Sequence, residues 1–426
     1  MRTTIAILAV LAAISVTVTP AAAQGFKVLH VFCENPACPD GVAPSALAPD
    51  GAGNFYGTTR GGGPSGAGTI FVLTRRYDGS YRFRTLYSFC AQANCFDGQL
   101  INGPPVIDVA GNLYGTALAG GETGYNGDIW ELTHGGKLKV LHSFCVSDCS
   151  DGAEPMTALT YLGAASGALY DGTSPLYGVT PFGGGTNFQG AAFQLTPGRH
   201  GWDFQTLYKF CSSANCADGA VPSGPLLPDA SGNLTGMTYG GGSGMSRGAV
   251  YRLSQSGGLW SETVLYSFCQ QANCTDGQQP YGRLAIDGAG NLFGTASAGG
   301  SACSGNSAGC GVVFMLAPDG QQTVLHSFCS MAHCADGGTP MDGPYLDTNG
   351  DLIGTAEYGG NASSSGVVWR LSGATFGTLH KFCKNGDCGK GGNPATALVS
   401  DGAGSLIGTT SIGGPNFGGV IYEVTP

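Results

Sequence analysis

The sequence predicts an all-β protein, a seven-bladed β-propeller of four-stranded antiparallel blades. Three observations lead to this prediction: a composition that disfavours helices, a sevenfold repeat, and four strand-like runs in each repeat. The chain has 426 residues, of which 75 are Gly and only 11% are charged. Gly weakens helix interiors and helix surfaces are usually charged, so short strands joined by tight turns are favoured.

A Phe-Cys step marks the repeat and recurs at intervals of 54 to 66 residues. A period in this range is typical of a repeat architecture. The first cysteines of the seven steps are Cys33, Cys90, Cys145, Cys211, Cys269, Cys329 and Cys383.

Each repeat contains the same four runs in the same order. The first is an apolar segment such as PSGPLLPD, which meets an Asp-x-x-Gly-Asn turn, as at Asp229 to Asn233. The second resembles NLYGT and leads into a Gly-rich loop such as AGGETGYNG. The third resembles DIWELT, and after a Gly turn the fourth, such as KVLHSFC, enters the Cys segment. Runs rich in Val, Leu, Ile, Tyr, Phe and Thr between such turns predict four antiparallel strands, which make one propeller blade.

The ends of the array predict how the ring closes. Residues 26–33 (FKVLHVFC) are a fourth strand without its first three, and residues 419–426 (GVIYEVTP) are a third strand without its fourth. If the N-terminal strand completes the last blade, no sheet edge stays unpaired. The main alternative is an open β-solenoid, whose coils are usually nearer to about 20 to 30 residues.

The first residues predict a signal peptide over residues 1–23, followed by a single seven-repeat propeller domain over residues 24–426. Arg2 precedes an apolar stretch from Ile5 to about Val18, and small residues lie directly before Gln24. No later segment is apolar for long enough to form a membrane helix. Without Arg2 the chain carries 17 basic and 28 acidic side chains and no Lys/Arg cluster. We therefore expect a secreted protein, periplasmic or extracellular, with no membrane span and no nucleic-acid partner.

The repeat resembles a known bacterial family. The segments LYSFC, NC-x-DG, D-x-x-GNLYGT and GG are similar to the GloVer (Gloeobacter/Verrucomicrobia-type) tandem repeat, for instance at residues 265–277, 287–295 and 299–300. The resemblance covers all seven repeats. It implies an exported propeller, and it implies no established activity or catalytic residues. Many relatives carry a C-terminal surface anchor, which this sequence does not show.

The 16 cysteines fall into local pairs, which predicts disulfides in an exported protein. A zinc site needs four ligands around one ion, whereas each repeat offers two thiols. A redox site favours the Cys-x-x-Cys spacing, which the repeat lacks. The predicted pairs are Cys33 with Cys38, Cys90 with Cys95, Cys145 with Cys149, Cys211 with Cys216, Cys269 with Cys274, Cys303 with Cys310, Cys329 with Cys334 and Cys383 with Cys388.

An Asp follows the second cysteine in six repeats, just before the innermost strand. These residues could ring the channel mouth and bind a cation or sugar hydroxyls. The simpler interpretation is turn formation, because an Asp side chain accepts backbone N–H bonds and the following Gly takes positive φ. The series is Asp40, Asp97, Asp151, Asp218, Asp276 and Asp336, with Lys390 in the seventh position. A second series belongs to the hairpin after the first strand, where we expect turn formation: Asp50, Asp108, Asp229, Asp287, Asp347 and Asp401.

Histidine offers no catalytic constellation. One position of the fourth strand holds either His or Tyr, which indicates a packing position between blades. Its occupants are His30, Tyr87, His142, Tyr208, Tyr266, His326 and His380.

Several aromatic residues lie in or beside the Gly-rich loops, which should be exposed. Their rings could stack on sugar rings, or they could cover the loop backbone. The candidates for a ligand face, besides the six Asp, are Tyr125, Phe182, Tyr239, Tyr358 and Phe417, with Phe188 beside them.

These observations favour an exported binding module for a carbohydrate or protein ligand, with no cofactor or metal and acting as a monomer. In a meander blade the Cys loops and the Gly-rich loops share one face, and loops on a rigid scaffold usually carry function. One alternative is a polysaccharide lyase or hydrolase near the channel mouth, with Asp151 or Asp218 as base or acid. A further alternative is a passive cell-surface structural protein.

Overall fold

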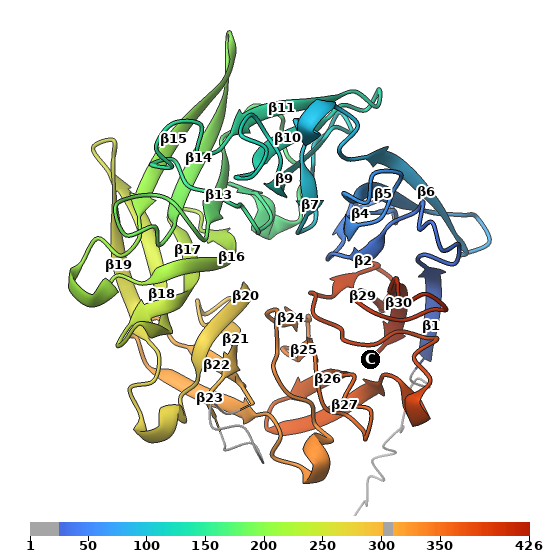
Figure 1. Cartoon of the computed structure of the whole chain (residues 1–426). Coiled ribbons are helices and arrows are strands. Elements are labelled where there is room, and N and C mark those ends of the chain that lie inside the picture. The colour runs from blue at the N-terminus through green and yellow to red at the C-terminus, as the bar shows by residue number, and fades with distance from the viewer. Residues whose placement is uncertain (1–24, 301–309) are drawn as a thin grey trace, which may run out of the picture.

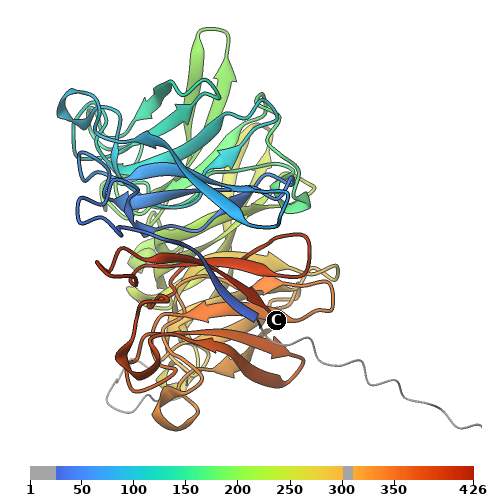
Figure 2. The same cartoon turned by 90° about the vertical axis from the view of Figure 1, so that its right-hand side faces the viewer.

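Seven antiparallel sheets surround a common axis in the computed structural model (Figure 1), and the side view shows how the blades stack around it (Figure 2). The structure describes residues 25–300 and 310–426, so the predicted signal peptide lies outside the described residues. Within these ranges there is no α-helix, and six short 3₁₀ helices occur. The predicted seven-bladed propeller is therefore confirmed.

The blades follow each other in chain order, each running from an inner to an outer strand. Blade 1 consists of β2 (Val42–Pro44), β3 (Ala48–Pro49), β4 (Phe55–Gly61), β5 (Thr69–Arg75) and β6 (Tyr81–Ser88). Blade 2 consists of β7 (Gln99–Ile101), β8 (Val106–Ile107), β9 (Leu113–Ala119), β10 (Asp128–Leu132) and β11 (Leu138–Ser143). Blade 3 consists of β12 (Thr160–Tyr161), β13 (Leu176–Thr180), β14 (Ala191–Gly198) and β15 (Gly201–Lys209).

The remaining blades repeat the pattern. Blade 4 consists of β16 (Ala220–Pro228), β17 (Leu234–Gly242), β18 (Ser246–Ser256) and β19 (Leu259–Ser267). Blade 5 consists of β20 (Gln278–Ile286), β21 (Leu292–Ala298), β22 (Val312–Leu316) and β23 (Gln322–Ser327). Blade 6 consists of β24 (Tyr345–Leu346), β25 (Leu352–Ala356), β26 (Val367–Ser372) and β27 (Thr375–Lys381). Blade 7 consists of β28 (Val399–Ser400), β29 (Leu406–Thr410), β30 (Val420–Thr425) and β1 (Gly25–Val31).

Blade 7 joins the two ends of the described chain. β1 pairs with β30 in antiparallel register, from Gly25 opposite Thr425 to Val31 opposite Val420. Figure 1 shows the blue first strand beside the red last strand. The predicted ring closure is confirmed, and the outer edge of β30 is covered.

A Gly in every second strand makes room for an aromatic ring of the third strand. Gly57 pairs with Phe71, and a Cβ on Gly57 would lie 2.4 Å from that ring. The same pairing recurs in all seven blades, and no real Cβ fits at such distances. The other pairs are Gly115 with Trp130, Gly178 with Phe193, Gly236 with Tyr251, Gly294 with Phe314, Gly354 with Trp369 and Gly408 with Tyr422. These buried rings form the hydrophobic clusters that join neighbouring blades.

The Thr that follows this Gly links one blade to the next. Thr58 donates from its hydroxyl to the Gly103 carbonyl at 2.9 Å, and Thr116 donates to Thr157 at 3.0 Å. Equivalent bonds run from Thr295 to Asp342, Thr355 to Thr396 and Thr409 to Ser45. The Gly-Thr step of the repeat therefore serves packing within a blade and bonding between blades.

Each fourth strand contains a β-bulge at its Leu. In blade 2 the register skips Leu141, because Trp130 faces Val140 and Ile129 faces His142. The same shift occurs in all seven blades. A bulge re-aims the side chain beside it, and here that side chain is the His or Tyr of the packing position.

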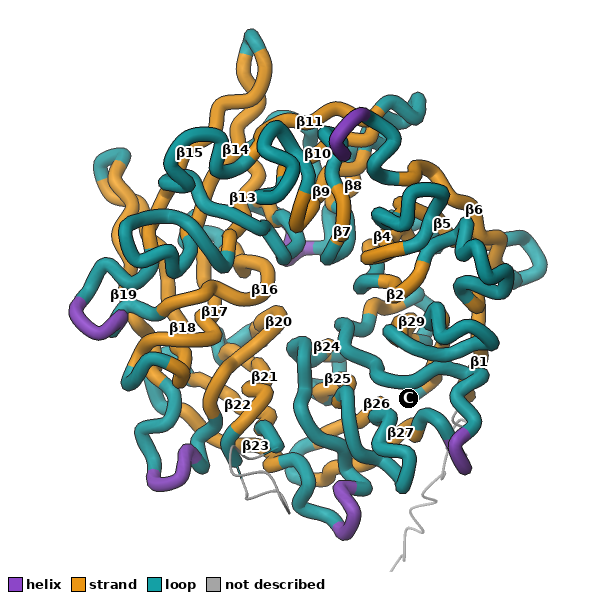
Figure 3. The backbone as a smooth tube through the Cα atoms, viewed as in Figure 1, coloured by secondary structure: helices purple, strands orange, loops and turns teal. Residues whose placement is uncertain are grey.

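The Cys segments form tight corners at the outer rim, where Figure 3 shows short helical turns. Five of these are η1 (Ala93–Cys95), η3 (Ala214–Cys216), η4 (Ala272–Cys274), η5 (Ala332–Cys334) and η6 (Lys384–Gly386), while η2 (Ala164–Ser166) lies in the long hairpin of blade 3.

Seven disulfides close these corners, and the pairs predicted for the repeat are confirmed. They join Cys33 to Cys38, Cys90 to Cys95, Cys145 to Cys149, Cys211 to Cys216, Cys269 to Cys274, Cys329 to Cys334 and Cys383 to Cys388. The eighth predicted pair, Cys303 with Cys310, includes a position outside the described residues.

The corners are less alike than seven equivalent repeats would predict. The second cysteine ends a 3₁₀ turn in four corners, but Cys38, Cys149 and Cys388 lie outside any helical turn. Local sequence explains the differences. Cys38 lies between Pro36 and Pro39, Cys149 follows its partner after four residues instead of five, and Cys388 comes after a turn that already ends at Gly386. Cys38 and Cys149 still take positive φ like the other second cysteines, whereas Cys388 does not.

Candidate functional site

The six corner Asp residues face the outer strand rather than the channel mouth. Asp97 is fully buried, and its carboxylate accepts hydrogen bonds from the Tyr87 hydroxyl at 2.8 Å and from the Ala91 and Gln92 amides at 2.9 Å. The bulged outer strand presents this hydroxyl to the corner, which explains why the carboxylate turns outward. The arrangement fits the turn-forming interpretation made from the sequence.

The other five corners repeat this contact. His30, His142 and His326 place Nε2 at 2.9 to 3.1 Å from an Asp carboxylate, and Tyr208 and Tyr266 donate to one at 2.9 and 2.7 Å. Their partners are Asp40, Asp151, Asp336, Asp218 and Asp276. Burial raises the pKa of the Asp40 carboxyl, but the hydrogen bonds from His30 and the Cys33 amide outweigh it and lower the pKa. The Asp40 carboxylate therefore stays charged and holds its corner.

The seventh corner lacks this contact, because Lys390 replaces the Asp. Burial and, to a smaller extent, the nearby Lys390 charge together lower the pKa of His380 to about 4. His380 is therefore neutral at pH 7. This is also the corner in which Cys388 departs from the backbone conformation of the other second cysteines.

The disulfide-bonded cysteines of the repeats stabilise these corners and offer no free thiol to a ligand. Cys38, Cys149 and Cys388 are partly buried, and each is bonded to the first cysteine of its own segment. A sulfur in a disulfide is neither a thiolate ligand nor a nucleophile. Their role in the site is to fix the backbone from which the loops depart.

The His rings of the packing position stack on the next blade. All four His rings stack on a Phe of the neighbouring outer strand, with centroids 3.6 to 3.9 Å apart. The pairs are His30 with Phe83, His142 with Phe204, His326 with Phe376 and His380 with Phe26. The predicted packing role of these four His is confirmed.

The three Tyr of the same position have no Phe opposite them. Four residues before the next His or Tyr, where the other blades place Phe, the chain has Leu138, Glu262 or Gln322. Burial and the Asp218 charge raise the pKa of Glu262 to about 7. The three interfaces with Tyr therefore have an apolar, an acidic or an amide side chain between adjacent outer strands, where the other four have a Phe ring.

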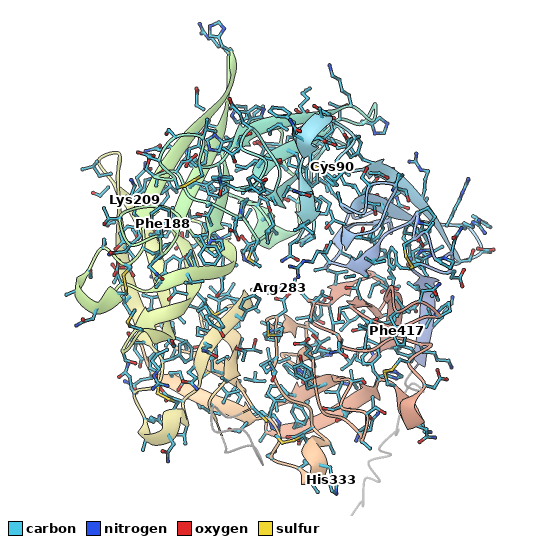
Figure 4. The ribbon with its side chains drawn as sticks, in the orientation of Figure 1. Cys90, Phe188, Lys209, Arg283, His333 and Phe417 are labelled. Atoms are coloured by element: carbon cyan, nitrogen blue, oxygen red, sulfur yellow. A yellow bond between two sulfur atoms is a disulfide. The ribbon has the colours of Figure 1, made fainter. Side chains whose placement is uncertain are left out.

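Most of the predicted loop aromatics are exposed. Tyr125 is 80% exposed and Phe417 is 65% exposed, and Phe182, Phe188 and Tyr358 are between 41% and 52% exposed. Figure 4 labels Phe188 and Phe417, which lie over different blades. Tyr239 differs, because it is partly buried and its ring lies 6.3 Å from that of Tyr281 in blade 5.

A charged pair ties the inner strands together near the axis. Arg283 points toward the centre of the ring in Figure 4 and donates to the Leu398 carbonyl at 3.3 Å. The Asp342 carboxylate accepts bonds from the Arg283 amide at 2.9 Å and the Ala397 amide at 2.8 Å. Blades 5, 6 and 7 are thereby joined.

The family follows from a match over most of the chain. The model described as the Gloeobacter/Verrucomicrobia repeat matches residues 13–175 and 171–331. The chain belongs to the Gloeobacter/Verrucomicrobia repeat family. Comparison with curated protein sequences gives no match.

Three solved structures are similar to this Gloeobacter/Verrucomicrobia repeat protein. A puromycin-hydrolyzing peptidase of Mycobacterium tuberculosis has a TM-score of 0.53 at 14% identity, over 90% of this chain and 50% of that one. PorZ, a surface component of the type-IX secretion system of Porphyromonas gingivalis, has a TM-score of 0.48 at 11% identity, over 88% and 46%. An ancestral GH74 enzyme has a TM-score of 0.49 at 10% identity, over 87% and 54%. The chain spans about half the length of the peptidase, and at this identity the likeness is one of fold alone.

The inner-strand pair of this repeat protein also has a signal in the sequence. Shortly after Pro280 and Pro340, Arg283 and Asp342 occupy positions that hold apolar or small residues in the other repeats. In the described ranges, no helix is both long enough and apolar enough to cross a membrane.

Proposed function

We propose that this repeat protein is an exported binding module whose Gly-rich-loop and Cys-loop face takes a carbohydrate. One observation carries the proposal. Seven aromatic side chains among the described residues are exposed, and six of them lie on loops of that one face: Phe96, Tyr125, Phe182, Phe188, Tyr358 and Phe417. The seventh, Tyr77, lies in a hairpin at the opposite end of the strands. Aromatic rings offer a flat apolar surface at low conformational cost, which suits stacking on a sugar ring.

The scaffold supports this use of the face. Seven disulfides and six carboxylates fix the corners from which these loops depart. A rigid base lowers the entropy lost when a ligand orders the loops. The disulfides also support export, because such bonds persist in oxidising compartments.

The enzymatic alternative draws less support from the geometry. Asp151 and Asp218 were the carboxylates that the sequence suggested as acid or base. Each accepts hydrogen bonds from an outer-strand ring and from corner amides, and Asp218 is almost fully buried. Both carboxylates are therefore held at the outer strand by their donors, and neither has a second carboxylate among these hydrogen-bond partners.

A glycan array combined with a reducing-end assay tests the proposal. Binding without release of reducing ends is expected. Phe417→Ser and Phe188→Ser should each weaken binding by roughly fivefold, because one aromatic contact contributes about 1 kcal/mol. Tyr77→Ser is the matched control, since it removes an exposed ring from the other end of the molecule and should leave binding unchanged. No binding on the array, or equal losses in all three variants, would overturn the proposal, and release of reducing ends would favour the enzyme.

A further inference from the structure

A polar groove of about 470 Å³ lies on the outer wall between blades 4 and 5. It lies between β19 with its Cys corner and the start of β23. The side chains that matter for its chemistry are Tyr266, Ser267, Gln270, Gln271, Gln321 and Gln322. The lining contains no charged residue.

Gln322 explains why this interface is open. At the equivalent position of four other interfaces a Phe ring covers the outer-strand His of the preceding blade. Here Tyr266 takes the His position and Gln322 takes the Phe position. An amide side chain fills less of the slot than a stacked ring, so the gap between adjacent outer strands stays accessible and polar.

The hydrogen bonds of Gln322 leave one strong acceptor without a donor. Its Nε2 donates to the Asp276 carbonyl at 3.1 Å, which fixes the direction of the amide. Its Oε1 is buried and has no hydrogen-bond partner in the structure. A buried acceptor without a donor is unfavourable, so a ligand hydroxyl that enters the slot between the two outer strands and donates to this oxygen gains binding free energy.

The other amides of the groove are partly committed and partly available. Gln270 Nε2 donates to the Ser267 carbonyl at 2.8 Å, and Gln271 Oε1 accepts from the Thr275 hydroxyl at 3.0 Å. These bonds hold both side chains in place and leave Gln270 Oε1 as an acceptor and Gln271 Nε2 as a donor. The groove thus offers fixed donors and acceptors and no net charge.

We infer that this groove binds a neutral sugar residue. A sugar hydroxyl both donates and accepts, so it can satisfy Gln322 Oε1 and bond to a neighbouring amide at once. A charged ligand would find no counter-ion among the lining side chains. The groove borders the Cys-loop face at Gln270 and Gln271 but contains none of the exposed aromatic residues of that face. The inference therefore stands or falls independently of the function proposed there.

Saturation-transfer NMR and calorimetry with cellotetraose, xylotetraose and mannotetraose test the inference, with trigalacturonate as the charged comparison. At least one neutral probe should bind and trigalacturonate should not. Gln322→Leu should weaken that binding at least tenfold without loss of stability, because it reproduces the Tyr87 and Leu138 pair of the interface between blades 1 and 2. The double variant Tyr266→His with Gln322→Phe restores the stacked pair of four other interfaces and should abolish binding. Gln255→Leu removes an exposed Gln of β18 outside the groove and serves as the control, with affinity unchanged.

The outcomes separate this site from the loop face. Loss of neutral-sugar binding in Gln322→Leu but not in Phe417→Ser supports the groove. Binding that survives both groove variants, or no binding by any neutral probe, overturns the inference. Loss in Phe417→Ser alone would leave the loop-face proposal standing and contradict the groove.

Discussion

Lys390 occupies the corner position that holds Asp in the other six repeats. In the other six corners a carboxylate accepts a bond from the His or Tyr of the outer strand. The seventh has an ammonium group near a neutral imidazole, and burial together with the Lys390 charge lowers the pKa of His380 to about 4. The unfolded chain binds a proton at its ordinary pKa of about 6.5, so protonation favours unfolding. Stability from this group is full above about pH 6.5 and is lost as the pH falls toward 4.

Replacing Lys390 by Asp should restore the pairing of the other corners. In Lys390→Asp the pKa of His380 should rise by at least about one unit, because a carboxylate stabilises the imidazolium. The loss of stability between pH 6.5 and 4, which one such group can make as steep as about 1.4 kcal/mol per pH unit, should flatten. NMR titration of His380 and urea unfolding across this range measure both effects. Lys384→Asp makes the same charge change in the same corner and should act weakly, so an equal shift in both variants would contradict this account.

Asp128 shows what the repeat pattern hid at this scale. It occupies a third-strand position that holds Thr, Ala or Val in the other blades. The residue is fully buried and neither carboxylate oxygen has a hydrogen-bond partner in the structure. Burial raises the pKa of this carboxyl well above its usual range, and the Asp97 charge adds to the effect. The Asp-Gly turns of the repeats do not reveal Asp128. It stands out only when the third strands are aligned position by position.

At the scale of elements, the strands could be predicted because their signals are local and recur seven times. Runs rich in Val, Leu, Ile, Tyr, Phe and Thr, Gly turns and the Asp-x-x-Gly-Asn hairpins predicted all four strands of each repeat. In that hairpin Asp50 accepts the Ala52 and Asn54 amides, as expected. The β-bulge was not predictable in this way, because Leu141 and its equivalents read as ordinary strand residues. That bulge decides where the corner carboxylates point, so their placement at the outer strand could not be derived from spacing alone.

The contribution of one disulfide to the free energy of unfolding can be measured at the corner closed by Cys90 and Cys95. Closing a loop of about six residues contributes on the order of 2 kcal/mol by the chain-entropy estimate. Cys90→Ser with Cys95→Ser should therefore lower the free energy of unfolding by about 2 kcal/mol, measured in urea without reductant. Hydrogen exchange at Ala91 and Gln92 should speed up only modestly, because Asp97 still accepts both amides. An unchanged urea midpoint, or full loss of protection at these amides, would show that this division of roles is wrong.

At the scale of the whole molecule, the stability of the ring depends on the seven residues of β1, which complete blade 7. β1 covers the edge of β30, whose Val420, Ile421 and Tyr422 are fully buried. Neighbouring hydrophobic clusters then pack in a ring in which each blade supports two others. Without β1, the edge of β30 would be open to pairing with another chain.

A variant lacking residues 25–31 should self-associate and unfold at a lower temperature than the intact chain. Light scattering after size exclusion and a thermal scan measure these effects. Adding the peptide of residues 25–31 in trans should reverse the added self-association and restore part of the lost stability, because it can occupy the vacated edge. A shortened chain with the same oligomeric state and the same transition as the intact chain would contradict a closing role for β1.

The pairing of β1 with β30 also sets the order of events during synthesis. The partner of the first strand lies in the seventh blade, so β1 stays unpaired while the six blades between them in the chain are made. Contacts between such distant segments are the slowest to form and leave intermediates prone to aggregation. A chain interrupted before residue 420 retains an unpaired β1, and an unpaired strand edge is prone to pair with other chains. Ring closure therefore requires that synthesis has reached β30.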